Sequence, residues 1–382
     1  RIGILTIACP DSGGVYQYTL TLVEALKQYI GENYELIQIK SPYFPKLLDN
    51  CIEVKSSKSS ILLRLKRIIY TYTGIRMGDL LGNYNLPEIK NIDLIISPVI
   101  TLLPYWMDKP YIVTIHDFQQ EYYPEFFTLK ERISRKITYK TGQKANAVVC
   151  ESEYVKKDIV NFLKVSEDRI FVLHSPAPIY IRKREMDDNF SVNIKEKYNL
   201  PTKYLFYPSQ FWYHKNHINL VKATRYIKDK YGEKINLVLV GSKKNNFENV
   251  MNEIQKLGLE EQVKYLGYVP DEDMPYLYKL STALVMPTLF ESVSLPIWEA
   301  FYLGVPVAAS NVCALPEQVG DAGLLFDPHN IEDIAEKIYK IWTDENLREK
   351  FAREGYNRIK ELTIENYAKE WEKIINEVVS NR

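Results

Sequence analysis

Short runs of apolar and β-branched residues alternate with longer segments of helical periodicity along the whole chain. Parallel strands need a crossover between them, usually a helix, so this alternation predicts an α/β fold with parallel sheets covered by helices. The strands expected in the first half are 2–8, 35–40, 93–97, 111–115, 147–150 and 169–173. Those expected in the second half are 204–208, 235–241, 263–267, 283–287, 306–310 and 323–326.

The length of 382 residues exceeds what one ordinary core accommodates, and two similar series of strands and helices predict two doubly wound domains. A stretch over 175–195 that is first rich in proline and then highly charged is the expected linker. We therefore place the domains at 1–185 and 186–363. The last segment, 364–382, has apolar residues at helical spacing and is expected to pack on another element.

Composition and charge disfavour several classes of function. Lys and Arg together number 49, as do Asp and Glu, so no excess of positive charge indicates nucleic acid as a partner. Four widely separated cysteines indicate neither a zinc site nor a disulfide framework, and they fit a reducing cytoplasm. Without an apolar run of 18 residues or a leader-like start, we expect neither a membrane span nor standard export.

Two adjacent glycines, Gly13 and Gly14, follow the first expected strand and precede a helix that begins near Val15. Their backbone N–H groups and the helix N-terminus are suited to close approach by an anion, although a simple tight turn explains the same residues. The stretch has neither the G-x-G-x-x-G spacing nor the Walker pattern, which disfavours hydride transfer and ATP hydrolysis.

His116 and Asp117 directly follow the expected strand 111–115. Ligands of open α/β sheets bind beyond the carboxyl ends of the strands, so His116 is a candidate binding residue. The alternative is a loop histidine that caps the next helix, and the residues alone do not decide between the two.

Lys215 lies in the loop after the expected strand 204–208, next to His214. A lysine at such a junction between strand and helix reaches a phosphate as a compact point charge. The alternative is a solvated lysine without a ligand.

Two glutamates, Glu291 and Glu299, flank Pro296 in the stretch FESVSLPIWEAFYLGVP. Proline suits the first position of a helix, so we expect a helix from about Pro296 that ends by Gly304. Glu291 then lies in the loop and Glu299 in the first helical turn, where both carboxylates can share a cleft. Solvated glutamates that compensate the helix dipole are the alternative.

Together and in this order, these stretches resemble the retaining glycosyltransferases of family GT4, which includes bacterial lipopolysaccharide and O-antigen mannosyltransferases. The resemblance covers nearly the whole chain and is most specific in PSQFWYHKNH, FESVSLPIWEAFYLGVPVAAS and ALPEQVGDAGLLFDP. It implies the GT-B fold, in which two Rossmann-like domains face each other across a cleft. The acceptor would bind the first domain, the nucleotide-sugar mostly the second, and the C-terminal helix would cross back to the first.

The resemblance also implies roles for individual residues. Lys215 would bind the donor diphosphate and Glu299 the ribose hydroxyls. Glu291 would lie at the transferred sugar, and His116 would position or polarise it, so these two are the candidate catalytic residues. The other candidates for donor binding are Gly13, Gly14, Ser209, Tyr268, Val269, Val293, Ser294 and Leu295.

Two places depart from the family pattern. Family members commonly have an arginine five or six residues before the lysine, where this chain has Gln210 and Ser209. Neutralisation of the diphosphate would then rely on Lys215, on helix termini or on another basic residue, with His214 as one candidate. A glycine that is common in the loop after the first glutamate is Ser294 here.

Transfer from a nucleotide-sugar builds positive charge on the sugar ring and negative charge on the leaving diphosphate. Lys215, the glycine amides and the helix near Pro296 would stabilise the diphosphate, while Glu291 and His116 would lie at the ring. No D-x-D pair follows an expected strand, so we expect no metal and no other cofactor. The resemblance implies front-face attack, in which the leaving phosphate accepts the proton of the acceptor.

Two basic and partly apolar stretches, 55–76 and 130–144, lie in the first half. Basic amphipathic helices bind anionic membrane surfaces, but an ordinary solvated helix face has the same pattern. We expect a cytoplasmic protein, and a lipid-linked acceptor would favour peripheral contact with the inner face of the cytoplasmic membrane.

The leading hypothesis is transfer of mannose from GDP-mannose to a glycan or lipid-linked glycan in surface polysaccharide biosynthesis. One alternative is a glycosyltransferase with another donor, such as a UDP-sugar. The others are a nucleotide-sugar epimerase and a non-catalytic paralogue that binds sugar nucleotides. The residues do not determine the base, the linkage or the oligomeric state.

Overall fold

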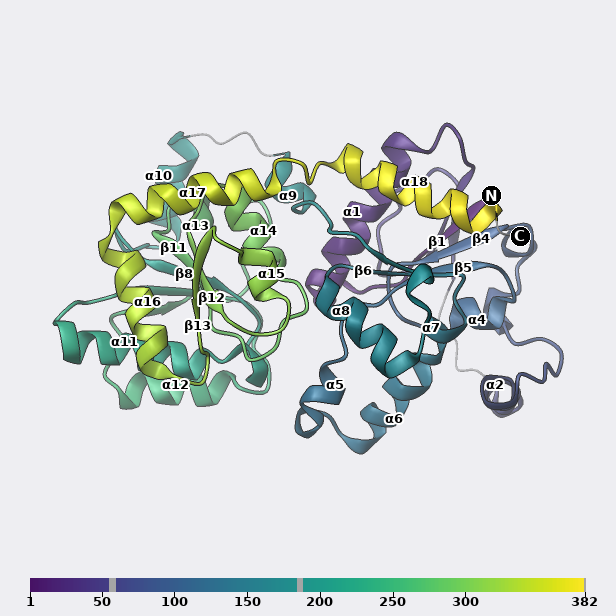
Figure 1. The fold of residues 1–382 in the computed structure, drawn as a ribbon, viewed down its shortest axis with the longest axis horizontal. Coiled ribbons are helices and arrows are strands. Elements are labelled where there is room, and N and C mark those ends of the chain that lie inside the picture. Colours follow the sequence, from purple (N-terminus) through teal and green to yellow (C-terminus); the bar gives the residue numbers. More distant parts are fainter. Residues whose placement is uncertain (55–59, 184–187, 381–382) are drawn as a thin grey trace. The chain divides into compact units, whose positions relative to one another are not determined.

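The computed structural model describes residues 1–54, 60–183 and 188–380, and the chain divides into two compact units (Figure 1). The first unit comprises Arg1–Pro176 and Leu362–Arg382, and the second comprises Ala177–Glu361. The boundary expected between 185 and 186 falls within 184–187, outside the described residues. The division between the units lies earlier, after Pro176.

The first unit contains a seven-stranded parallel sheet with the order β3-β2-β1-β4-β5-β6-β7. The strands are β1 (Ile2–Thr6), β2 (Leu36–Lys40), β3 (Cys51–Glu53), β4 (Leu94–Ser97), β5 (Tyr111–Thr114), β6 (Ala147–Cys150) and β7 (Ile170–Val172). Ile2 of β1 pairs with Leu36 of β2 on one side and with Leu94 of β4 on the other. The strand order therefore reverses between β1 and β4, at the kind of position where open α/β sheets bind ligands.

Successive residues of these strands face two separate hydrophobic cores, because helices cover both faces of the sheet. Ile4 and Ile96 belong to one core, while their neighbours Leu5 and Ile95 belong to the other. The helices before the C-terminal segment are α1 (Gly14–Tyr29), α2 (Ile61–Thr73), α3 (Pro87–Lys90), α4 (Leu103–Met107), α5 (Gln119–Tyr122), α6 (Leu129–Thr138), α7 (Lys140–Lys144) and α8 (Glu153–Asp158).

The C-terminal helix, α18 (Ile364–Ser380), packs on α1 within the first unit (Figure 1). Its buried face contains the apolar residues whose spacing predicts a helix: Tyr367, Trp371, Ile374, Ile375 and Val378. The return of the chain to its N-terminal domain is thereby confirmed.

The second unit contains a six-stranded parallel sheet with the order β10-β9-β8-β11-β12-β13. The strands are β8 (Leu205–Pro208), β9 (Leu237–Val240), β10 (Val263–Tyr265), β11 (Ala283–Met286), β12 (Val307–Ser310) and β13 (Gly323–Phe326). The helices are α9 (Ile179–Arg182), α10 (Asp188–Lys197), α11 (His217–Tyr231), α12 (Phe247–Lys256), α13 (Met274–Lys279), α14 (Leu295–Tyr302), α15 (Leu315–Val319), α16 (Ile331–Thr343) and α17 (Glu345–Ile359). Here the strand order reverses between β8 and β11.

The expected fold class, two doubly wound parallel sheets with helices, is confirmed. Each strand expected from the sequence is present, with ends that differ by at most two residues. The additional strand, β3, consists of the three residues CIE at the edge of the first sheet. Three residues are too few to show the period-two alternation that identifies a strand.

Replacing Trp371 with alanine tests the packing of α18. Trp371 is fully buried in the core that includes Leu22 and Leu26 of α1. The cavity left by Trp371→Ala is expected to lower the free energy of unfolding by about 3–5 kcal/mol. Urea denaturation followed by circular dichroism measures this change, with the exposed Glu377→Ala on the same helix as the matched control. A loss below about 1 kcal/mol would contradict the packing described.

Candidate functional site

Lys215 and Glu291 follow two neighbouring strands of the second sheet, β8 and β11, on either side of the reversal in strand order. Lys215 Nζ and Glu291 Oε2 form an ion pair, with 18% and 15% of the two side-chain surfaces exposed. Charges shielded from water interact more strongly than those of an exposed surface pair. The structure thus brings together the residues expected at the donor diphosphate and at the donor sugar.

Hydrogen bonds between the two loops fix the position of this ion pair. Leu289 N donates to His214 O at 2.7 Å, and Thr288 Oγ1 donates to the same carbonyl at 3.0 Å. Asn216, in the left-handed conformation with φ of 55°, donates from Nδ2 to Pro287 O at 2.9 Å. The loops after β8 and β11 are therefore held together by bonds that do not involve the charged groups.

The surroundings of His214 disfavour the positive charge that neutralisation of a diphosphate would require. Burial, assisted by the nearby charges of Lys215 and His217, lowers the pKa of His214 to about 2. Its imidazole is therefore neutral near pH 7. Lys215 is left to supply the positive charge at this junction.

Glu299 lies in the second turn of α14 rather than the first, and only 3% of the residue is exposed. Tyr180 of α9 donates from its hydroxyl to Glu299 Oε1 at 2.6 Å, and the Tyr278 hydroxyl of α13 donates to Oε2. Burial raises the pKa of Glu299 to about 7, although both hydroxyls favour the ionised form. Both carboxylate oxygens already have hydrogen-bond partners in the protein. Sequence reasoning missed Tyr180 and Tyr278, because a single tyrosine belongs to no pattern that marks it as such a partner.

The loop between Glu291 and α14 is fixed by Gln318 of α15. Ser294 N donates to Gln318 Oε1 at 2.9 Å, and Gln318 Nε2 donates to Ser294 O at 2.7 Å. The Ser294 amide expected at the donor is therefore bonded to the protein in this structure. Val293 and Leu295 are half-buried on either side of it.

The remaining candidates of the second unit follow β8 and β10. Ser209 N donates to Val240 O at 2.7 Å and so continues the pairing of β8 with β9. Sequence reasoning missed Gly241, where φ is 144° and a Cβ atom would lie 2.3 Å from Ser209 O, so that only glycine fits. After β10, Tyr268 is 77% exposed and Val269 is buried.

In the first unit, Gly13 and Gly14 form the start of α1 after β1. Gly13 is the N-cap with φ of 59°, a value that favours glycine, and Gly14 is the first helical residue. The helix has 16 residues, so its N-terminal amides and its dipole favour an anion at this end. The turn thus presents a helix N-terminus at the carboxyl edge of the first sheet.

His116 follows β5 at the same edge, and both of its ring nitrogens contact protein acceptors. Nδ1 lies 3.1 Å from Glu151 Oε2, and Nε2 lies 2.9 Å from Pro98 O. Tyr18 of α1 packs edge-on against the ring, with 4.9 Å between the ring centroids. In this arrangement a direct hydrogen bond from His116 to a sugar requires one of these contacts to break. At the start of α5, Gln119 N donates to Asp117 Oδ1 at 3.0 Å, so the side chain that contacts the first helical residue is that of Asp117 and not that of His116.

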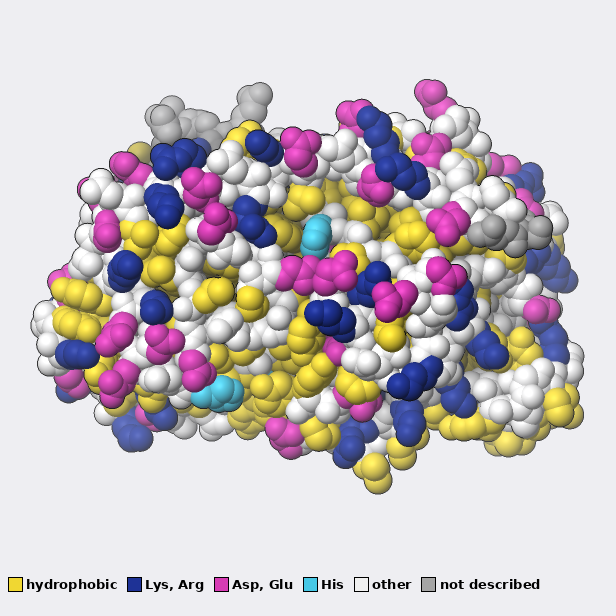
Figure 2. All heavy atoms as spheres, viewed as in Figure 1, with side chains coloured by type: hydrophobic (Ala, Val, Ile, Leu, Met, Phe, Trp, Pro, Cys, Tyr) yellow, Lys and Arg dark blue, Asp and Glu magenta, His cyan; other side chains and the backbone are white. Residues whose placement is uncertain are grey.

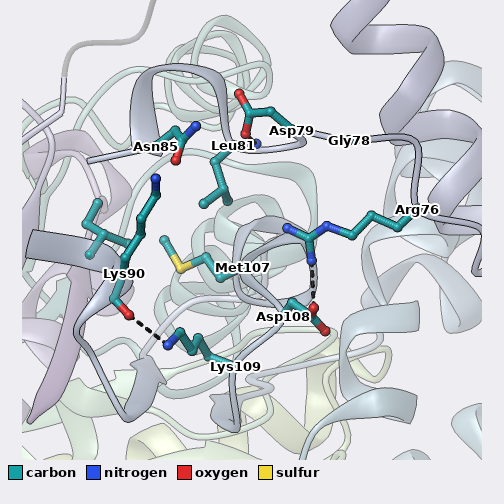
Figure 3. Close-up of a pocket in the computed structure, with 10 residues that line it drawn as sticks. Arg76, Gly78, Asp79, Leu81, Asn85, Lys90, Met107, Asp108 and Lys109 are labelled. Atoms are coloured by element: carbon teal, nitrogen blue, oxygen red, sulfur yellow. Dashed lines mark hydrogen bonds and ion pairs between the residues drawn. The ribbon is translucent and has the colours of Figure 1, made fainter. Parts of the chain in front are cut away.

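A cavity of about 450 Å³ lies at the opposite, amino edge of the first sheet (Figure 3). Arg76 pairs with Asp108 at 2.8 Å on one side of it, and Lys109 Nζ donates to Lys90 O at 2.8 Å on another. The full lining consists of Arg76, Gly78, Asp79, Leu81, Asn85, Ile89, Lys90, Met107, Asp108 and Lys109. The residues expected at the functional site are not among them.

Two further kinds of site are absent from the described residues. No group of three His, Cys, Asp or Glu side chains there is arranged to hold a metal ion. No helix in 1–54, 60–183 or 188–380 is long and apolar enough to cross a membrane.

Two family models match the sequence, and so do curated relatives. The model described as Glycosyltransferase Family 4 matches residues 12–178, and the model described as Glycosyl transferases group 1 matches residues 190–358. The O-antigen chain mannosyltransferase B of Escherichia coli is 30% identical over 268 residues, which are 69% of this chain and 69% of that protein.

Solved structures share the fold over nearly the whole chain. WaaG, a glycosyltransferase involved in lipopolysaccharide biosynthesis, superposes with a TM-score of 0.73 at 15% identity, covering 98% of this chain and 99% of WaaG. HepE of Anabaena, solved in complex with UDP and glucose, superposes with a TM-score of 0.74 at 16% identity, covering 100% of both chains. The expected GT-B fold is thereby confirmed.

The pH dependence of stability tests the burial of Glu299. A carboxyl group whose pKa rises from 4.5 to about 7 on folding contributes stability that is fully present below pH 4.5 and is lost as the pH rises through 7. The wild type should lose about 3 kcal/mol relative to Glu299→Gln between pH 4.5 and pH 8. Urea denaturation at the two pH values measures this loss.

The matched control for this measurement is Glu349→Gln, which changes an exposed glutamate of α17 and should follow the wild type. Parallel pH profiles for the wild type and Glu299→Gln would show that the carboxyl group is not buried as described.

Proposed function

Because the chain belongs to the group 1 glycosyltransferases of the GT4 type, we propose that it transfers mannose from GDP-mannose to a glycan or lipid-linked glycan. The proposed setting is the biosynthesis of a surface polysaccharide, and the E. coli relative, an O-antigen chain mannosyltransferase, supports this choice. The observation that carries the proposal is the shielded ion pair of Lys215 and Glu291, at the edge of the second sheet where its strand order reverses.

In the proposed mechanism, the donor diphosphate binds Lys215 and separates it from Glu291. The carboxylate of Glu291 then faces the sugar ring, where positive charge develops, while the lysine stabilises the leaving diphosphate. The leaving phosphate accepts the acceptor's proton on the same face, so the anomeric configuration is retained. We propose that the reaction needs no divalent metal, since the ammonium group of Lys215 complements the phosphate charge.

The proposed contact of Glu299 with the ribose involves an exchange of partners. Tyr180 donates its hydroxyl to Glu299 Oε1, as a ribose hydroxyl would. When the nucleotide binds, a ribose hydroxyl then replaces the Tyr180 hydroxyl at Glu299 Oε1, while Tyr278 keeps its hydrogen bond to Oε2. Because one hydroxyl replaces another, binding adds little to the cost of desolvating the buried carboxylate.

Calorimetry with GDP, UDP and ADP, followed by assays of GDP release from GDP-mannose, tests the proposal. GDP is expected to bind most tightly, and GDP release should persist in EDTA. Preference for UDP would favour the alternative of a UDP-sugar donor, which the HepE complex with UDP and glucose makes the natural second candidate. Absence of binding to all three nucleotides would contradict the proposed function.

Variants of the charged residues separate affinity from turnover. Lys215→Ala and Glu299→Ala are each expected to weaken GDP binding at least about tenfold, the loss of one charged hydrogen bond. Glu291→Ala should leave GDP binding nearly unchanged and lower turnover about 100-fold, as the loss of electrostatic stabilisation in other enzymes does. Lys350→Ala, an exposed lysine of α17, is the matched control. Equal and small effects of all three site variants would refute the assignment.

Contact with an anionic membrane is the second part of the proposal. In α2 the buried residue is Thr71, and α6 has no buried residue. Large apolar side chains on the two helices are exposed: Ile61, Leu62, Leu65, Ile68, Tyr72, Leu129 and Ile133. Figure 2 shows hydrophobic and basic side chains interspersed over this region of the first unit. Residues 55–59 of the basic stretch lie outside the described residues.

These two helices have the properties of a surface that binds lipid. Exposed apolar side chains insert at the level of the headgroups, and each nearby Lys or Arg adds about 1 kcal/mol at an anionic surface. Lys140 Nζ lies 4.1 Å from the centre of the Tyr72 ring and so links α7, which follows α6, to α2. Contact through α2 and α6 would bring the enzyme to a lipid-linked acceptor.

Vesicle flotation tests the membrane contact. The wild type is expected to float with vesicles that contain phosphatidylglycerol and to remain in solution with pure phosphatidylcholine. The double variant Leu62→Ser and Ile68→Ser should bind anionic vesicles about tenfold more weakly, since it loses inserted apolar surface. Tyr356→Ser, at an exposed site of the second unit, serves as the control. Equal flotation with both lipids would contradict the contact.

A further inference from the structure

Glu151 is a buried acid of the first unit that the proposed mechanism leaves without a role. Glu151 follows β6 at the carboxyl edge of the sheet. Strand β6 pairs with β5, and the loop after β5 carries His116. Glu151 Oε2 lies 3.1 Å from His116 Nδ1, and Ser175 Oγ donates to Glu151 Oε1 at 2.7 Å. Only 17% of the His116 side chain and 10% of the Glu151 side chain are exposed. The acid and the histidine therefore form a shielded pair.

The protonation state of His116 follows from its two contacts. The carbonyl oxygen of Pro98 only accepts a hydrogen bond, so His116 Nε2 must carry a proton. The ionised carboxylate of Glu151 also only accepts, so Nδ1 must carry a proton as well. The hydrogen bond with Glu151 favours the charged form of the imidazole, so the shared proton is assigned to the histidine. Both nitrogens are then donors, which makes the ring an imidazolium.

We propose that Glu151 is a positioning residue that holds His116 as a fixed imidazolium at the carboxyl edge of the first sheet. In agreement with this geometry, burial opposes the charge of His116, but the hydrogen bond and the charge of Glu151 outweigh it and raise the pKa of the ring. The Pro98 carbonyl and the charge of Asp117 act in the same direction.

The groups that face the ring from other elements leave its charge in place. Tyr18 of α1 packs edge-on against the ring and directs its hydroxyl to Thr114, 3.1 Å away. Tyr367 of α18 acts on Tyr18 rather than on His116. Arg135 of α6 lies 3.4 Å from Asp117 and partly offsets that carboxylate. The direct ionic partner of His116 is thus Glu151.

The position of this cation relates it to the proposed reaction. β5 is separated from β1 by one strand, β4, which corresponds to about 10 Å across the sheet. Tyr18, which touches the ring, lies about one turn into the helix that begins at Gly14. The imidazolium therefore adds to the positive field of the α1 N-terminus at the carboxyl edge of the first sheet, and this field favours a negatively charged group of the substrates. This last step rests on the proposed function.

The proposed role of Glu151 predicts the direction in which the pKa of His116 changes when the carboxylate is removed. A histidine with a raised pKa keeps its charge at low pH and loses it as the pH rises through that pKa. Removing the carboxylate in Glu151→Gln should lower the pH at which His116 loses its proton by about one unit or more, the usual effect of one close opposite charge. The amide of glutamine keeps similar volume and hydrogen-bonding capacity.

NMR titration of the full chain with ¹³C-labelled histidine measures this midpoint directly, and His116→Gln assigns the resonance. Glu151→Gln should move the midpoint to lower pH, and Glu151→Asp should restore part of the shift. Glu153→Gln, an exposed acid two residues away, should leave it unchanged. An unchanged midpoint in Glu151→Gln would overturn the proposal, whatever the reaction of the protein.

The pH profile of GDP release from GDP-mannose then tests the link to turnover. In Glu151→Gln we expect turnover to fall about tenfold and the alkaline limb to move to lower pH by the amount that NMR records. If the NMR midpoint shifts and the pH profile does not, Glu151 holds His116 as an imidazolium but this charge has no role in turnover. Absence of GDP release in the wild type would count against the proposed function and would leave the NMR result standing.

Discussion

The parallel direction of the strands is the constraint on which the rest of the structure depends. A parallel strand is followed by a crossover, so the carboxyl ends of all strands in one sheet lie at one edge. In the first unit, the strand interiors are buried between two layers of helices that form two apolar cores. The loops at the carboxyl edges are therefore where His116 of the first unit and Lys215 and Glu291 of the second are found.

The charged groups at these edges are paired with partners from their own unit. Lys215 pairs with Glu291, His116 pairs with Glu151, and Glu299 accepts hydrogen bonds from two tyrosine hydroxyls. Breaking such a shielded contact without a replacement is costly, because a desolvated charge would be left unpaired. A ligand that binds at Lys215 and Glu299 has to exchange partners with the second unit, and the proposed nucleoside diphosphate offers both the negative charge and the hydroxyls to do so.

The strands and the edge on which the site lies could be predicted from the sequence because both depend on local patterns. Runs such as LVLV and ALVM identify buried strands, and a polar residue directly after a run lies at the carboxyl edge. Strand β3, with three residues, is too short to give this signal.

The partners of the site residues could not be predicted, because they depend on contacts between residues far apart in the chain. Tyr180 and Glu299 are separated by 119 positions, and His116 and Glu151 by 35. The neutral state of His214 is likewise a consequence of burial, which one sequence does not reveal. Burial also explains why Glu299, which in sequence looks like a polar residue at a helix start, has a pKa of about 7.

The proposed function requires that a hexose is transferred from a nucleotide-sugar with retention of the anomeric configuration. The anomeric configuration of the product tests this claim most directly. Proton NMR of the product formed from α-configured GDP-mannose should show a new α-linkage from the first turnover onward. A β-linked product would contradict front-face transfer and would require an inverting mechanism in which a base activates the acceptor on the opposite face.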